Sequence, residues 1–332
     1  MRFVICSDQH FHNWREFACQ NEDNINSRLQ LTIDELNHVA ETAQKKKVNQ
    51  IFFAGDLFHQ PGHIQPSVFN PVCNALYNIA SNGIEIVMIP GNHDLEFSVS
   101  NDIGSPMTIF HYLDVENTCI VNKPIVHGEV ALFPWERDLE KLKESMRERA
   151  EPYRVAIIHA PINDVLYGIP NNGLVASELA DMGYQYVFAG HYHNHKNFGN
   201  GVISIGALGH QTWSDVGSLA GHIFVDTDKK IIEHIPSKMP NFVKMQSGDY
   251  SACKGNYCKV LDVEQGEENK VRNECFTNGA KAVLTHTKVV GGEEVARSRI
   301  DTSLAVTVTS HCKTNDISEE DTGKCLERIN EI

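Results

Sequence analysis

The stretch IEIVMIPGNHD, at residues 84–94, joins an apolar run to a glycine that is followed by three polar side chains. A short apolar run bounded by turn residues is typical of a buried β-strand. Two earlier stretches have the same form, RFVICSDQH at 2–10 and IFFAGDLFH at 51–59. In all three, Asp, Asn or His follows the apolar run within a few residues. We therefore predict three strands that end in chemically active side chains.

Helical segments separate these strands. Residues 27–47 carry apolar side chains at helical spacing. The repeated positions are Leu29, Ile33, Leu36, Val39, Ala40 and Ala43. A second helix is expected near 67–82, and a third segment around 107–113 is also apolar. Alternating strands and helices indicate a mainly parallel sheet that is covered on both faces.

The pattern continues to about residue 240 and then changes. Before that point we expect helices at 137–150 and 174–182, and strands at 154–158, 185–189, 202–205, 222–226 and 231–235. After it we expect strands at 257–262, 281–287 and 303–309, and helices at 266–278 and 318–331. The chain is therefore predicted to have two domains, at 1–240 and 241–332.

Composition excludes several classes of protein. The 332 residues are 41% hydrophobic, and no window approaches the ~18 uninterrupted apolar residues of a membrane span. The first ten residues lack the apolar core of a signal peptide, so we expect a cytoplasmic protein. Nine scattered cysteines without a C-x-x-C pair indicate reduced thiols. The net charge of −14 argues against nucleic-acid binding through a broad basic face alone, although bound cations would restore positive charge at a phosphate site.

Metal-type ligands recur at the ends of the predicted strands. They are Asp8 and His10, then Asp56, then Asn92 and His93, then His159, then His191 and His193. Ligands of open α/β sheets bind beyond the carboxyl ends of the strands, so these side chains should meet at one edge. A single histidine is more often a surface or hydrogen-bonded residue. The repeated placement is what favours a shared metal site.

Five short motifs resemble those of the calcineurin-like metallophosphoesterase superfamily. In order they are DQH at 8–10, GDLF at 55–58, GNHD at 91–94, IIHAP at 157–161 and GHYH at 190–193. The resemblance covers roughly the first 240 residues. It implies an α/β fold, a four-layer αββα sandwich with a dinuclear metal site.

The resemblance also implies how the ligands are shared. One ion would be held by Asp8, His10, Asp56 and His193, and the other by Asp56, Asn92, His159 and His191. Asp56 would bridge the two ions. Oxygen and imidazole ligands without cysteine suit Mn²⁺, which the family uses, better than Ca²⁺ or a structural Zn²⁺.

Three further residues are expected to act in catalysis. His93 would stabilise the transition state or protonate the leaving oxygen, and Asp94 would hold the other ring nitrogen of His93. A purely structural role is the alternative for His93. His59 has a family counterpart near the substrate phosphate, and the alternative is an exposed loop histidine without a role.

Within the superfamily, the GDLFH motif, the FPWE stretch at 133–136 and the spacer lengths resemble the SbcD nucleases, which include the meiotic-recombination nucleases. Residues 255–288 look like the small α/β capping domain of compact phage versions. A β-α-β addition that only stabilises the fold is the alternative. The resemblance implies that the helix at 317–332 docks on the coiled coil of an SbcC-type ATPase, and the alternative is that it folds onto its own domain. The chain has no nucleotide-binding P-loop, so any ATP dependence would come from such a partner. The family is usually dimeric through helices, which correspond here to 67–82 and 101–113.

The expected activity is therefore manganese-dependent cleavage of DNA, as an exonuclease or endonuclease, in recombination, repair or end processing. Five cations of the capping domain are candidates for contacting DNA phosphates: Lys244, Lys254, Lys259, Lys270 and Arg272. The enzymatic alternative is hydrolysis of a nucleotide or another small phosphodiester. A non-enzymatic scaffold is the third possibility, and the complete ligand set argues against it.

Overall fold

The computed structural model describes residues 1–96, 105–112, 116–152, 154–166 and 172–288, together with Ser318 and Thr322. The chain divides into two compact units, Met1–His286 and Thr287–Ile332. The predicted strand at 303–309 lies outside the described residues, as does the helix at 318–331 apart from Ser318 and Thr322. Among the described helices, none has the length and apolar character that crossing a membrane requires.

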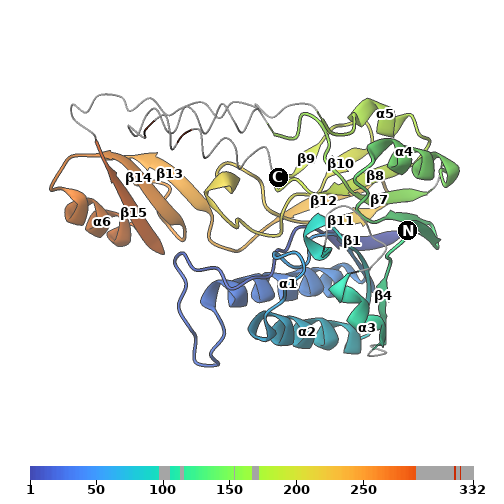
Figure 1. Ribbon diagram of the computed structural model, residues 1–332, viewed down its shortest axis with the longest axis horizontal. Helices are drawn as coiled ribbons and strands as arrows, with labels where there is room; N and C mark the ends of the chain where they lie inside the picture. The colour runs from blue at the N-terminus through green and yellow to red at the C-terminus, as the bar shows by residue number, and fades with distance from the viewer. Residues whose placement is uncertain are drawn as a thin grey trace. The chain divides into compact units, whose positions relative to one another are not determined.

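The first sheet runs through the middle of the large unit (Figure 1). Its six strands are β1 (Arg2–Cys6), β2 (Gln50–Ala54), β3 (Glu85–Ile89), β4 (Thr118–Ile120), β11 (Gly221–Asp226) and β12 (Ile231–Pro236). Their order is β12–β11–β1–β2–β3–β4. Strands β1 to β4 are parallel, whereas β11 is antiparallel to both of its neighbours. The parallel part contains three of the five strand ends that carry predicted ligands.

The second sheet has the order β5–β6–β7–β8–β10–β9. Its strands are β5 (Ile125–His127), β6 (Val130–Phe133), β7 (Val155–His159), β8 (Tyr186–Gly190), β9 (Lys196–Asn197) and β10 (Val202–Ser204). Strands β6, β7, β8 and β10 are parallel, and the two edge strands are antiparallel to their neighbours. This sheet provides the remaining predicted ligands, from β7 and β8.

Helices cover the outer face of each sheet, so the order of layers is αββα (Figure 1). On the first sheet lie α1 (Ser27–Lys46), α2 (Pro66–Ser81) and the short α3 (Ile109–Tyr112), and on the second lie α4 (Leu139–Glu148) and α5 (Ala176–Ala180). Three short 3₁₀ helices, η1 (Asn92–Asp94), η2 (Pro106–Thr108) and η3 (Trp213–Asp215), lie in the connections. The predicted four-layer sandwich is confirmed. The alternation of elements had indicated one sheet, and two sheets form because β5 to β10 pair among themselves.

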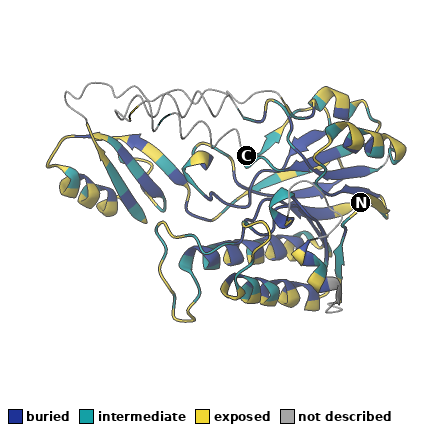
Figure 2. Ribbon diagram, viewed as in Figure 1, coloured by how far each residue is buried: buried dark blue, intermediate teal, exposed yellow. Residues whose placement is uncertain are grey.

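Three buried apolar clusters hold these layers together, and their residues form the dark interior of Figure 2. The middle cluster fills the space between the sheets. There the ring of Phe3 lies 5.2 Å from that of Phe52 and 5.9 Å from that of Phe188, which belongs to the second sheet. Because the residues on both faces of β1, β2, β3, β7 and β8 are buried, these strands read as nearly continuous hydrophobic runs.

Helix α1 is defined by its caps and by one apolar face. The Asn26 side chain accepts hydrogen bonds from the N–H groups of Arg28 and Leu29, which satisfies two of the free donors at the helix start. The helix ends at Lys47, whose left-handed backbone (φ 54°) lets its N–H bond back to the carbonyl of Ala43. The predicted apolar positions of this helix are buried against the first sheet.

A third, smaller sheet follows Pro240. It contains β13 (Phe242–Gln246), β14 (Tyr257–Val263) and β15 (Ala282–Thr287), and α6 (Glu268–Thr277) packs on it over a separate apolar cluster. Strand β13 was not predicted, because Lys244 and Gln246 interrupt its apolar pattern. The compact unit extends to His286 and includes most of this sheet. The domain boundary near 240 therefore stays a prediction.

Candidate metal centre

The ends of five strands bring the predicted ligands together across the two sheets. Asp8 and His10 follow β1, Asp56 follows β2, and Asn92 opens η1 after β3. His159 is the last residue of β7, and its Nε2 lies 3.5 Å from Oδ1 of Asp56 in the other sheet. The sequence predicted this convergence at the strand ends. The structure shows that the shared edge is formed by both sheets.

One group of donors surrounds His10. Its Nε2 lies 3.1 Å from Nε2 of His193, 3.5 Å from Oδ2 of Asp56 and 3.9 Å from Oδ1 of Asp8. Ligand atoms of Asp8, His10 and His193 all lie within 4.8 Å of one another. These are the four residues that were assigned to the first ion.

A second group lies on the other side of Asp56. The Asn92 side-chain oxygen lies 3.2 Å from Nε2 of His159 and 3.0 Å from Nδ1 of His191. Oδ1 of Asp56 faces His159, whereas its Oδ2 faces His10. The two oxygens of this carboxylate therefore point to different groups of donors, as a bridging ligand requires.

The chemistry of the donors fits two divalent cations. Asp8 and Asp56 are buried, and within the described part of the chain Oδ1 of Asp8 has no hydrogen-bond partner. Burial raises the pKa of Asp8. Burial is also the largest single effect on Asp56, but His159, His10 and His93 together outweigh it and lower the pKa of Asp56. Burial also holds the pKa of His10 well below its ordinary value, which favours the neutral imidazole that binds metals. A buried pair of carboxylates needs cations to offset its charge.

Backbone geometry at the strand ends is unusual. Left-handed φ values occur at four predicted ligands: Asp8 (52°), His10 (46°), Asp56 (55°) and His191 (109°). Such conformations are uncommon outside glycine and concentrate at functional sites. Gly91 allows a close approach, since a Cβ there would lie 2.2 Å from Oδ1 of Asp56.

Two histidines are oriented by hydrogen bonds that the ring nitrogen pointing away from the candidate metal site donates. His159 donates its Nδ1–H to the carbonyl of Ala54 at 2.7 Å, and His193 donates its Nδ1–H to Oδ1 of Asp215 at 2.7 Å. In each ring, Nε2 is therefore the nitrogen that faces the other candidate metal ligands. The bond to Asp215 raises the pKa of His193 against the effect of burial. Asp215 was not predicted, because it lies 22 residues beyond the GHYH motif and no local pattern identifies it.

His191 is held differently. Its ring stacks on Trp135 with a centroid distance of 5.2 Å and an interplanar angle of 25°. Burial lowers the pKa of His191 to about 3, so this ring is neutral near pH 7. The tryptophan belongs to the FPWE stretch, which the sequence analysis used only as a mark of the nuclease subfamily. The structure gives that residue a contact with a predicted ligand.

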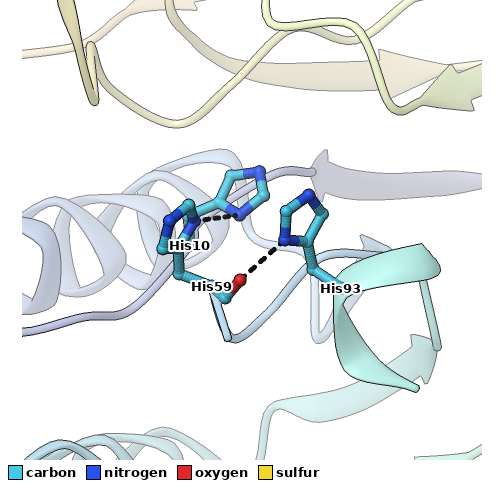
Figure 3. A group of neighbouring side chains, drawn as sticks. All are labelled: His10, His59 and His93. Carbon is cyan, nitrogen blue, oxygen red and sulfur yellow. Dashed lines mark hydrogen bonds between the residues drawn. The ribbon is translucent and has the colours of Figure 1, made fainter. Parts of the chain in front are cut away.

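Figure 3 shows how His93 and His59 lie beside His10. Nδ1 of His93 donates to the backbone carbonyl of His59 at 2.6 Å, and the backbone N–H of His93 donates to Oδ1 of Asp56 at 2.9 Å. Nδ1 of His59 lies 3.3 Å from Nδ1 of His10. Burial, and then the neighbouring His93, lower the pKa of His59 to about 4. A neutral His59 can accept the outer N–H of His10 and so orient that ligand.

Asp94 does not contact the ring of His93, so that part of the prediction is wrong. Its buried carboxylate accepts hydrogen bonds from the backbone N–H groups of Leu57, Phe58 and Gly91, at 2.9 to 3.2 Å. The three donors belong to the GDLF and GNHD motifs. The single imidazole of His93 could not offer Asp94 three N–H donors. Burial and the charge of Asp56 raise the pKa of Asp94 to about 7. Asp94 therefore ties the two motif loops together beneath Asp56.

Comparison with known proteins agrees with this geometry. The family description "Calcineurin-like phosphoesterase" matches residues 1–195. The chain belongs to this family. Members bind two divalent metal ions, and this calcineurin-like phosphoesterase has clusters of candidate ligands for both. It is a metal-dependent phosphoesterase by family, and hydrolysis is the reaction class. A search of curated proteins finds no match for the chain.

Three solved structures are similar to the chain at low sequence identity. A protein of Thermus thermophilus is 13% identical, with 71% of this chain and 98% of that chain covered and a TM-score of 0.40. A dimetal phosphatase from Danio rerio is 9% identical, with 68% and 91% covered and a TM-score of 0.41. The Pseudomonas putida nuclease MPE is 14% identical, with 70% and 87% covered and a TM-score of 0.32.

Proposed function

We propose that this phosphoesterase is a manganese-dependent DNA nuclease of the SbcD type, acting as an exonuclease or endonuclease in recombination, repair or end processing. The observation that carries the proposal is the way the segment after Pro240 attaches beside the metal centre. A small phosphodiester needs only a closed pocket. A polynucleotide needs an open groove with several cations and stacking surfaces.

A row of aromatic rings and one arginine connects the metal centre to the third sheet. The ring of Trp14 lies 4.5 Å from that of His59, and the guanidinium of Arg28 lies 5.2 Å from the centroid of Trp14. The same guanidinium lies 5.0 Å from Phe242 and 5.7 Å from Tyr257, at the starts of β13 and β14. Arg28 is buried, and its Nη2 donates to the carbonyl of Gln211 at 2.6 Å. These contacts fix the third sheet next to the catalytic edge.

A groove of about 770 Å³ is lined by two members of this row, Trp14 and Arg28. Its walls include Asn13, Trp14, Arg15, Arg28, Gln60 and Thr212. Gln60 follows His59 directly, so the groove begins at the catalytic edge. Within the described residues Nε1 of Trp14 has no hydrogen-bond partner. An aromatic ring, two arginines and several amides suit a strand whose bases stack and whose phosphates are anionic.

The third sheet adds cations on the face that packs toward Arg28. In the parallel register of β13 and β14, Phe242 pairs with Tyr257 and Lys244 pairs with Lys259. Residues two apart on a strand share a face, so both lysines lie on the face that Phe242 and Tyr257 turn toward Arg28. The less acidic third sheet therefore supplies positive charge where the DNA backbone would leave the metal centre.

The two ions, when bound, would neutralise phosphate oxygens and lower the pKa of an attacking water. Mn²⁺ is the ion we propose, because both groups combine carboxylate or amide oxygens with imidazoles. His93 keeps Nδ1–H on the His59 carbonyl in either protonation state, so Nε2 is the atom that can give a proton to the leaving oxygen. Asp94 holds the loops from which Asp56 and His93 project.

The partner is proposed to be an SbcC-type coiled-coil ATPase that binds the helix predicted at 317–332. A homodimer is proposed through α2, where Tyr77 is 58% exposed, and the segment near Ile109, which is 37% exposed. The proposed compartment is the cytoplasm of a bacterium or of a phage-infected cell, where the DNA substrate would be.

Deleting 317–332 should leave hydrolysis of a small ester unchanged and abolish co-purification with the ATPase. Retained co-purification would contradict the docking role.

The deciding experiment compares substrates on one Mn²⁺-loaded preparation, with and without the ATPase. We expect cleavage of linear DNA that falls steeply with salt, and slow turnover of cyclic nucleotides. Asp56→Ala, which removes a ligand of both ions, is the control for contaminating nucleases. Intact DNA together with rapid turnover of a cyclic nucleotide would instead support the small-phosphodiester alternative.

A further inference from the structure

A second group of metal-type side chains lies on the helix-covered face of the first sheet. Glu35 and His38 are one turn apart in α1, and His222 lies in β11. Phe224, two residues after His222, belongs to the apolar cluster under α1, whereas Ile223 belongs to the cluster between the sheets. His222 therefore faces α1, on the side away from the space between the two sheets.

The three side chains are close and mostly buried. One ligand atom from each lies within 4.8 Å of those of the other two. Nδ1 of His38 lies 3.1 Å from Oε1 of Glu35, and the rings of His38 and His222 are 5.1 Å apart. Glu35 is 2% exposed and His222 is fully buried. The other carboxylate oxygen of Glu35 accepts the backbone N–H of Lys238 at 2.8 Å, which fixes the direction of the carboxylate.

One polar atom of this group has no partner. Nε2 of His222 bonds to the hydroxyl of Thr42 at 2.9 Å, and within the described residues the buried Nδ1 has no hydrogen bond. A buried polar atom without a partner costs roughly 1–3 kcal/mol. Burial, and then the charge of His38, lower the pKa of His222 to about 3, so the ring is neutral and Nδ1 offers a lone pair. A histidine that gives its outer N–H to a hydroxyl and keeps the other nitrogen free has the form of an oriented metal ligand.

We propose that Glu35, His38 and His222 bind a divalent first-row transition ion, with Zn²⁺ as the best match. Two imidazoles and one carboxylate are a donor set that Zn²⁺ accepts, and three protein ligands leave a position for water next to the partly exposed His38. The ion would join α1 to β11 and stabilise the attachment of the helical layer. This inference does not depend on the proposed nuclease activity.

The first test counts bound zinc. The full-length chain, its His38→Gln variant and a matched control, His127→Gln, are loaded with Zn²⁺, freed of excess ion and measured by elemental analysis. His127 makes a similar 3.1 Å contact with Glu85, but neither belongs to a group of three ligands among the described residues. We expect His38→Gln to lose one zinc per chain and His127→Gln to lose none, with Mn²⁺-dependent ester hydrolysis unchanged in both. Equal zinc in all three proteins would overturn the proposal.

A second measurement uses the unaltered protein and so does not require His38→Gln to fold. Hydrogen–deuterium exchange at the C2 position of each histidine, read by peptide mass spectrometry, slows when a ring nitrogen binds metal and imidazolium formation is blocked. We expect Zn²⁺ to slow exchange at His38 by tenfold or more and to leave His127 unchanged. The same exchange at His38 with and without Zn²⁺ would show that Glu35, His38 and His222 form only a hydrogen-bonded group.

Discussion

The metal centre and the third sheet differ in how their side chains are held. At the metal centre, carboxylates and rings are buried, and acceptors such as Ala54, Asp215 and His59 orient the histidines. In the third sheet, Lys244 and Lys254 are exposed, and the packed residues form a small apolar cluster of their own. The side chains of the metal centre are thus held in fixed positions, whereas the exposed lysines of the third sheet are not, and it is these lysines that we propose select the substrate.

The largest expected effect follows from removing the residue that serves both groups of donors. Asp56→Ala should abolish hydrolysis of bis-p-nitrophenyl phosphate, since Oδ1 and Oδ2 face different donor groups. The exposed Asp34 on α1 provides the matched control, and Asp34→Ala should retain activity. Steady-state rates and bound-metal analysis measure both. Full activity in Asp56→Ala would contradict a dinuclear site.

Replacing the proposed acid should have the next largest effect. His93→Ala should keep the metals and lose on the order of 10²–10⁴ in rate, the usual contribution of a general acid. His63→Ala, at an exposed loop histidine, is the matched control and should behave as the unaltered enzyme. Loss of metal from His93→Ala would show that His93 is a ligand instead.

Asp215 allows a test of how strongly the hydrogen-bond partner of His193 affects metal affinity. In Asp215→Asn the amide oxygen can still accept the Nδ1–H of His193, but the negative charge is lost. We expect metal affinity to fall about 10- to 100-fold, as mutation of the hydrogen-bond partner behind a ligating histidine typically does. Asp226→Asn is the control, because Asp226 is also buried but pairs with Arg2 at the sheet edge, 3.4 Å away. Metal titration that shows equal affinity in both variants would contradict a role for Asp215.

These three sites also show what could be predicted from sequence. The convergence of the candidate ligands could be predicted, because each stands at or just after the end of a strand and in a short motif. Asp215 could not be predicted, because its contact with His193 depends on a turn that begins at Thr212 and on no repeated pattern. The hydrogen-bond partner of the His93 ring was predicted wrongly. The backbone carbonyl of His59 accepts the bond that the prediction assigned to Asp94, and a backbone carbonyl cannot be recognised from the residue type. The division into two sheets followed from the family motifs and not from the alternation of strands and helices, since strand pairing is a long-range property that alternation does not encode.

The smallest effect should come from the exposed cations of the third sheet, and the structure selects which ones to test. Lys270 pairs with Glu267 at 2.8 Å, and Arg272 contacts Thr285, so both are engaged locally. Lys259 lies 4.0 Å above the ring of Trp213, and reversing its charge would also remove a cation–π contact worth about 0.5–1 kcal/mol. Lys244 and Lys254 are exposed, and their charges can be changed without disturbing such contacts.

We therefore expect the double variant Lys244→Glu and Lys254→Glu to weaken DNA cleavage several-fold at low salt and less at high salt. The reason is that each lost phosphate contact lowers the salt slope of binding by about one. Ester hydrolysis should not change, because screening removes the influence of exposed charges on the metals beyond ~10 Å. Lys45→Glu, at the C-terminal end of α1 and 73% exposed, is the control for a charge reversal elsewhere on the surface and should have no effect on DNA cleavage. Equal loss of ester and DNA hydrolysis in the double variant would mean that the third sheet supports the fold of the metal centre and does not select DNA.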